Sequence, residues 1–192
     1  MKQYFVRSLY LQTAYDGQRD PFPFKYDILQ AINDYESDFN ENVGRKVYAT
    51  FSDPAQALDC YLDCRVYSGC SIVCGMRVYR GYELVSYDDE NGEKLIAYDF
   101  SDNGRALTLD IAKTVFTGLD DGRVLVETQD IITDDMTVKV CKTESSAKAQ
   151  ATRAELNVSC KYSLVLGRGD LRTVTHRDYR NIRYTSICMK KA

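Results

Sequence analysis

Short runs of β-branched and aromatic residues, each closed by a turn-forming stretch, constrain the fold of this chain more than any other feature. Two of them, at 82–87 and 93–100, flank the stretch Asp-Asp-Glu-Asn-Gly at 88–92. That arrangement is typical of a β-hairpin. A second hairpin is predicted across the Asp-Asp pair at 134–135. In full, the predicted strands are 4–15, 46–51, 70–79, 82–87, 93–100, 123–133, 136–143, 156–167 and 171–189.

Helical patterns are concentrated nearer the N-terminus. Residues 25–39 repeat apolar side chains at the spacing of one helix face. A second helix is predicted after Asp53, which is a good N-cap, with Pro54 at the first helical position. Residues 105–116 fit a helix or a strand, with a helix favoured, and 144–156 fit a short helix or a mobile loop. The pattern predicts an α+β fold, with mostly antiparallel sheet and two or three helices concentrated in the N-terminal half.

Length and composition favour a single domain over residues 1–192. The chain has 192 residues, of which 44% are apolar, and this is enough for one core. The segment 157–192 is expected to be a basic, β-rich part of that domain. From Lys161 onward there are eight Lys or Arg and two acidic side chains, although the whole chain has a formal net charge of −3. The rest of the chain is therefore acidic.

The sequence predicts a cytoplasmic location (host cytoplasm if the protein is viral), no membrane contact and no metal. The N-terminus lacks a signal-peptide apolar stretch, and no apolar run approaches the roughly 18 residues that cross a bilayer. The seven cysteines are an odd number, which favours reduced, buried thiols. Cys60 and Cys64, like Cys70 and Cys74, are separated by three residues, whereas compact zinc sites use two. The single histidine, His176, is distant in sequence.

Three stretches carry residue types that can hold a nicotinamide dinucleotide. Arg7 lies in the first predicted strand, and Thr50 and Ser52 lie at the end of the second, directly before a helix. Glu127 lies at the head of the later hairpin. An arginine, a small hydroxyl residue and an acid near the ribose form a set that can bind NAD and stabilise the positive charge that develops as nicotinamide leaves.

This order resembles the arginine class of the ADP-ribosyltransferase superfamily. The stretch 48–61 is similar to the middle motif of that class, and 127–140 to its acidic strand with the following hairpin. The resemblance implies NAD as cofactor and transfer of ADP-ribose to a macromolecular target. Gln129 stands where the class has its catalytic glutamate, so Glu83 and Glu93 are rival acids. The implied site residues are Arg7, Thr50 and Ser52 for NAD binding, and Glu127 or Glu83 for catalysis.

Two other functions fit the same sequence. The first is a non-enzymatic protein that binds and blocks a host or defence macromolecule, most simply a protein, as phage and mobile-element proteins do. The chain has 15 tyrosines and many arginines, and these residue types often anchor protein interfaces. The second is nucleic-acid binding through phosphate contacts and stacking. If the segment 176–182 is a strand, Arg177, Tyr179 and Asn181 share one face. The arginines predicted to bind nucleic acid are Arg168, Arg172, Arg177, Arg180 and Arg183.

Overall fold

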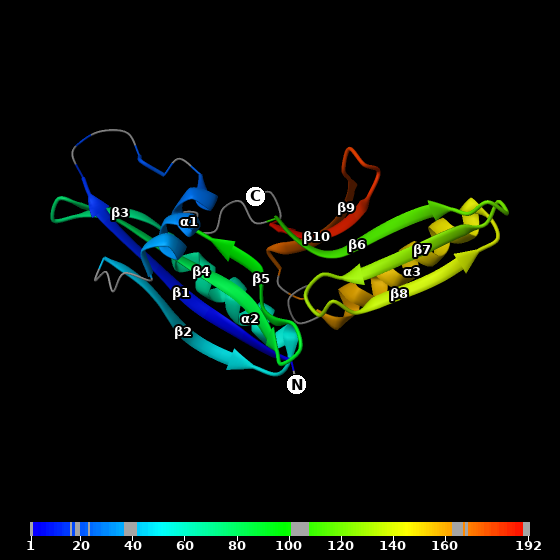
Figure 1. Cartoon of the computed structure of the whole chain (residues 1–192), viewed down its shortest axis with the longest axis horizontal. Helices are drawn as coiled ribbons and strands as arrows, with labels where there is room; N and C mark the ends of the chain where they lie inside the picture. The colour runs from blue at the N-terminus through cyan, green and yellow to red at the C-terminus, as the bar shows by residue number, and fades with distance from the viewer. Residues whose placement is uncertain are drawn as a thin grey trace. The chain divides into compact units, whose positions relative to one another are not determined.

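The chain divides into two compact units, Met1–Ala106 and Leu107–Ala192 (Figure 1). Every strand pairing joins two strands of the same unit and is antiparallel. The division does not test whether the chain folds as one domain, so that expectation stays a prediction. The computed structural model describes residues 2–15, 17, 20–22, 24–36, 42–100, 108–162, 167 and 169–189.

The N-terminal unit is built on a five-stranded sheet in the order β2-β1-β4-β3, with β5 also paired to β4. Strands β1 and β4 are the longest, and their residues pair along the whole of β1. This pairing makes the two strands the centre of the unit. The strands are β1 Gln3–Ala14, β2 Val43–Phe51, β3 Gly69–Val73, β4 Met76–Asp88 and β5 Gly92–Asp99.

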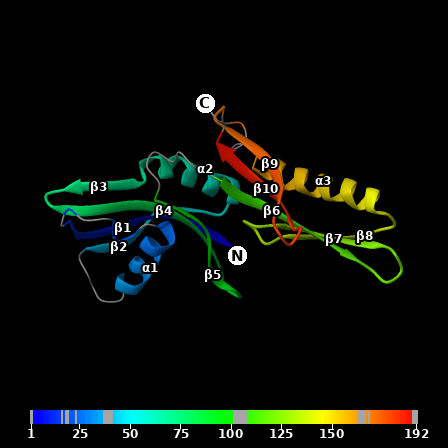
Figure 2. The same ribbon diagram turned by 90° about the horizontal axis from the view of Figure 1, so that it is seen from above.

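Two helices cover opposite faces of this sheet (Figure 2). Successive residues of a strand point to opposite faces, so β1 can contribute to a core on each side. On one side, Leu9 and Leu11 pack with Ile28 and Ile32 of the first helix. On the other, the second helix buries residues such as Leu58. The helices are α1 Lys25–Glu36, α2 Pro54–Cys64 and the short 3-10 helix η1 Arg65–Tyr67.

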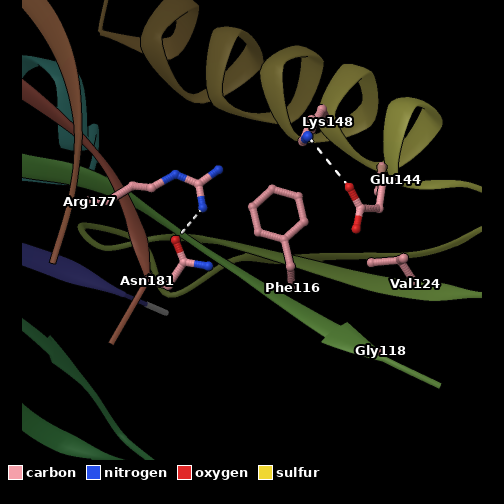
Figure 3. Close-up of a pocket in the computed structure, with 8 residues that line it drawn as sticks. Phe116, Gly118, Val124, Glu144, Lys148, Arg177 and Asn181 are labelled. Carbon is pink, nitrogen blue, oxygen red and sulfur yellow. Dashed lines mark hydrogen bonds and ion pairs between the residues drawn. The ribbon is translucent and has the colours of Figure 1, made fainter. Parts of the chain in front are cut away.

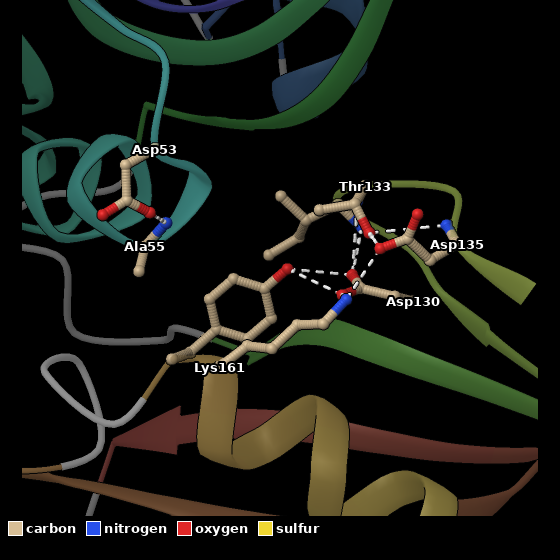
Figure 4. A network of polar contacts seen from close by, with 8 residues as sticks. Asp53, Ala55, Asp130, Thr133, Asp135 and Lys161 are labelled. Atoms are coloured by element: carbon tan, nitrogen blue, oxygen red, sulfur yellow. Dashed lines mark hydrogen bonds and ion pairs between the residues drawn. The ribbon is translucent and has the colours of Figure 1, made fainter. Parts of the chain in front are cut away.

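The start of α2 confirms the sequence prediction. The Asp53 side chain accepts a hydrogen bond from the Ala55 backbone N–H at 2.9 Å (Figure 4). Pro54 occupies the first turn. An N-cap of this kind contributes about 1 kcal/mol to the stability of a helix. The cap fixes the point at which the chain leaves β2 and turns onto the sheet.

The C-terminal unit is a five-stranded sheet in the order β8-β7-β6-β10-β9, covered on one face by α3 Glu144–Lys161. Ala147 and Ala151 of α3 pack on Val126 and Cys141 of the sheet. No helix among the described residues is both long and apolar enough to cross a membrane. The strands are β6 Thr108–Gly118, β7 Val124–Asp130, β8 Met136–Cys141, β9 Leu171–Arg177 and β10 Arg183–Met189.

A buried carboxylate joins the end of α3 to the turn between β7 and β8 (Figure 4). Asp130 accepts hydrogen bonds from the backbone N–H groups of Ile132, at 3.0 Å, and Thr133, at 3.2 Å. It also accepts one from the Tyr162 hydroxyl at 2.9 Å and one from the Lys161 ammonium at 3.1 Å. Every partner is a donor, so this carboxylate has a structural role.

The α+β prediction is confirmed: the residues that the structure describes form antiparallel sheets and three α-helices, besides the short η1. Two helices lie in the N-terminal half, as expected, but the third is α3. Four local predictions were wrong. The sequence favours a helix at 105–116, but strand β6 occupies 108–118, paired on both sides. Residues 156–161, predicted as part of a strand, belong to α3, and 70–79 is a hairpin that turns at Cys74 and Gly75, both with positive φ. The single strand predicted at 171–189 is two strands, β9 and β10, joined by a turn at 178–182.

Candidate functional site

The proposed NAD-binding arginine lies in an ion-pair cluster of the N-terminal unit. Arg7 of β1 is paired in register with Glu83 of β4, and its Nη1 lies 3.4 Å from Glu83 Oε1. Arg45 of β2 approaches the same oxygen, with its Nε at 2.8 Å. Arg7 also contacts Glu93 of β5. Glu83 is buried, and the guanidinium groups of Arg7 and Arg45 balance its negative charge.

The two hydroxyl candidates lie farther along β2. Thr50 is paired with Phe5, two residues before Arg7 on β1, so Thr50 and Arg7 share a face of the sheet. Ser52 follows the end of the strand, and both hydroxyl residues are exposed. The structure thus brings Arg7 and Glu83 into contact and places Thr50 on their face. Arg7 does not offer a free guanidinium to NAD, because two carboxylates already engage it.

Glu127, the other proposed catalytic acid, lies in the C-terminal unit. It sits on β7, paired with Val115 of β6 and Val138 of β8, on the sheet face opposite α3. Its side chain is half-buried. Arg7 and Glu127 lie in different units, and a catalytic role for the two residues together stays a prediction.

Within the basic C-terminal segment, residues 171–189 form the β9–β10 hairpin, whose arginines are partly engaged. Arg180 pairs with Asp178 at 3.2 Å, and Arg183 with Glu155 at 2.6 Å. Arg177 donates to Asn181 at 2.5 Å. The expectation that Arg177, Tyr179 and Asn181 share a strand face was wrong, because 178–182 is the turn between β9 and β10. Arg172 is exposed on β9, and Arg168 lies outside the described residues.

The cysteines are less buried than the sequence predicts. They are free thiols, of which Cys64 and Cys141 are buried, while Cys70, Cys74 and Cys160 are exposed. Burial raises the pKa of the Cys64 thiol to about 12. Within the described parts of the chain, no group of three or more His, Cys, Asp or Glu side chains is placed to hold a metal ion. The expectation that the protein has no metal stays a prediction.

A cavity of about 350 Å³ opens beside the first turns of α3 (Figure 3). Phe116 forms one wall, and the Arg177 guanidinium lies over its ring at 5.7 Å. On the α3 side, Lys148 pairs with Glu144 at 3.6 Å. The charges of this cavity are therefore largely engaged by groups of the protein itself.

A polar layer is buried under α3. Glu155 is 4% exposed and pairs with Arg183 of β10, while the hydroxyls of Thr114 and Thr128 lie 3.1 Å apart. Burial raises the pKa of the Glu155 carboxyl, whereas the hydrogen bond from Thr114 and the charge of Arg183 lower it. The sequence did not reveal this layer, since its members come from four elements.

A second cavity of about 350 Å³ is a groove between β8 and α3. Lys139 projects to the α3 side of the sheet, because its partner on β7 is Val126, which α3 covers. Lys142 and Arg153 complete the cationic lining. Among the residues that the structure describes, none of these three forms an ion pair. We call Lys139, Lys142 and Arg153 the cationic groove.

The other face of β8 is apolar and exposed. Met136, Val138 and Val140 alternate along the strand and project away from α3, because Cys141 and Lys139 point towards it. Their exposed fractions are 54%, 54% and 44%. We call these three residues the apolar row. In sequence they are visible as the alternation in Met-Thr-Val-Lys-Val-Cys, which predicted the strand but not the face that it leaves open.

Strand β8 is also an edge of its sheet. It pairs with β7 on one side, and in the described structure no strand lies along its other side. An edge strand presents unpaired backbone N–H and C=O groups. The cationic groove, the apolar row and this free edge therefore meet on one strand.

No protein-family model, no curated protein and no solved structure matches this chain.

Proposed function

We propose that this chain is a binding protein that occupies the surface of a partner protein through strand β8 of its C-terminal unit. The single observation that carries the proposal is the apolar row, three neighbouring large apolar side chains that are each about half exposed on the sheet face opposite α3. Solvent-facing positions of an antiparallel strand are normally polar. A contiguous exposed apolar patch is typical of a protein interaction site.

Neighbouring residues extend this surface. Leu125 of β7 lies beside Val140, and Val115 of β6 lies on the far side of Glu127 from Val138. The patch therefore spans three strands, with Glu127 at its centre. An apolar patch with an embedded charge can bury area and still select a partner by its polar groups.

The test uses three immobilised forms of the full chain in a lysate of the source cells. Val138→Thr with Val140→Thr makes the row polar while keeping its β-branched shapes. Leu156→Gln is the matched control, since Leu156 is 60% exposed on α3 of the same unit. We expect a protein that the wild type and the control retain and the double variant loses. That protein is then purified and tested for direct binding. Identical sets of proteins on all three forms contradict the proposal.

The second candidate is the ADP-ribosyltransferase activity that the sequence resemblance implies. The observation in its favour is that Arg7 and Glu83 meet on the sheet face that also carries Thr50. NAD would have to displace carboxylates from Arg7, so the test is binding. A ligand at a hundredfold excess over its dissociation constant stabilises a protein by about 2.7 kcal/mol. An unchanged melting temperature with millimolar NAD rules this candidate out.

A further inference from the structure

We infer that β8 takes up an extended segment of the partner as an additional strand, and that this segment alternates acidic and apolar side chains. The inference rests on the proposed function and specifies the chemistry of the partner. It follows from the position of β8, which is an edge strand bordered by a groove on one face and by exposed apolar side chains on the other.

The backbone of β8 provides the first part of the recognition. A segment laid along its outer side can form a ladder of main-chain hydrogen bonds, which gives affinity without reading sequence. Both edges of this sheet are strands, but the other, β9, exposes mainly threonine and charged residues. Of the two edges, β8 alone combines a free edge with the apolar row.

The two faces of β8 provide the second part. Residues directly opposite each other on neighbouring strands share a face, whichever way the strands run. Side chains of the added segment that lie opposite Val138 and Val140 therefore extend the apolar row. Those opposite Lys139 point into the cationic groove, towards Lys142 and Arg153. A segment that alternates apolar and acidic residues satisfies both faces at once.

Charge complementarity decides the class of the groove-facing residues. The three cations of the groove have no acidic partner within the described part of the chain, and none of its lining residues is acidic. Elsewhere in this unit, Arg123, Lys148, Lys161, Arg180 and Arg183 each pair with a carboxylate. Aspartate or glutamate from the partner supplies the missing charge.

The probe is a fluorescein-labelled octapeptide of alternating Val and Glu, and binding to the full chain is followed by fluorescence anisotropy at low salt. One control peptide has the same composition in the repeated order Val-Val-Glu-Glu. A second keeps the Val-Glu alternation but carries an N-methyl group on every second backbone nitrogen. A third alternates Val and Lys. We expect each control to bind about tenfold more weakly or worse, which corresponds to about 1.4 kcal/mol.

Two variants of the protein locate the site. Lys142→Glu with Arg153→Glu should weaken binding of the alternating Val-Glu peptide about tenfold, because two attractive surface pairs become repulsive. Arg172→Glu with Arg180→Glu makes the same change in net charge on the β9–β10 hairpin and should leave binding nearly unchanged. Amide hydrogen exchange should slow in 136–141 on peptide addition, and not in 171–177.

The outcomes separate this inference from the function on which it rests. Strand addition is overturned if the alternating peptide and the Val-Val-Glu-Glu peptide bind equally well. It is also overturned if the peptide does not slow amide hydrogen exchange in 136–141. Binding of a single-stranded oligonucleotide that the groove variant abolishes, without any preference among the peptides, overturns it in favour of a nucleic-acid site. If the Val138 and Val140 substitutions still remove a partner from the lysate, the proposed function stands even though strand addition fails.

Discussion

Arg7 and Glu83 face each other across the two central strands of the N-terminal sheet, with Arg7 Nη1 3.4 Å from Glu83 Oε1. Arg45 approaches the same oxygen from the neighbouring strand, with its Nε at 2.8 Å. One buried carboxylate thus holds cations from β1 and β2 against β4. The arrangement explains why the first predicted NAD-binding residue and a predicted catalytic acid meet, and it also gives both of them a structural role.

Glu83→Gln should destabilise the protein by about 3 kcal/mol, since removing one partner of a buried ion pair leaves the remaining charge uncompensated. Here two guanidinium groups would lose their shared carboxylate. Urea unfolding followed by circular dichroism measures the effect. Glu93→Gln is the control, because the Glu93 side chain is 53% exposed and an exposed ion pair contributes about 1 kcal/mol or less. Equal losses in the two variants would contradict the structural role of Glu83.

Gly81→Ala should also destabilise the N-terminal unit, by about 2 kcal/mol, as overpacking does. A Cβ at Gly81 would clash with the Phe100 ring and lie 2.6 Å from the Asp99 carbonyl oxygen, so the ends of β4 and β5 must move apart. Gly44→Ala in β2 is the control, because its nearest neighbour would be Tyr10 Cβ at 3.9 Å. The melting temperatures of the two variants test the difference. A stable Gly81→Ala variant would show that Phe100 can repack.

Local signals account for the parts of the fold that were predictable. Asp53 and Pro54 mark a helix start by themselves, and the stretch 88–92 marks a turn. The structure confirms both predictions, with α2 starting at Pro54 and the β4–β5 hairpin turning at 88–92. Residues 105–116 carry apolar spacings that fit either a helix or a strand. The segment is a strand because β7 and β10 pair with its two edges. A local sequence pattern cannot show pairing partners that are distant in sequence.

The candidate site was less predictable than the fold, for the same reason. Lys139 and Lys142 are close in sequence to the apolar row, but Arg153 joins them only because α3 packs over this part of the sheet. The Arg7–Glu83 contact likewise depends on the register of β1 with β4. The sequence identified the residue types, and the register determined which of them meet.

Asp130→Asn should lower the free energy of unfolding by about 2 kcal/mol, because an amide cannot replace a carboxylate that accepts from two backbone N–H groups, a hydroxyl and an ammonium. Urea unfolding of the variant measures the loss. Asp135→Asn is the matched control, since Asp135 also contacts Lys161 but its side chain is 68% exposed. A change of about 0.5 kcal/mol is expected there. If the control loses as much as Asp130→Asn, the exposed ion pair with Lys161 is the stabilising contact.

The buried carboxyl of Glu155 should make stability depend on pH. Burial raises its pKa above the ordinary value of 4.5, so the folded protein binds this proton more tightly than the unfolded chain does. The stability that this difference contributes is fully present below the unfolded pKa of about 4.5 and is lost as the pH rises through the folded pKa. Glu155→Gln cannot titrate, so the stability of the wild type relative to this variant should fall as the pH is raised from 4.5 to 7.5. Urea unfolding at a series of pH values measures the difference. A difference that does not change with pH would show that Arg183 and Thr114 offset the cost of burying this charge completely.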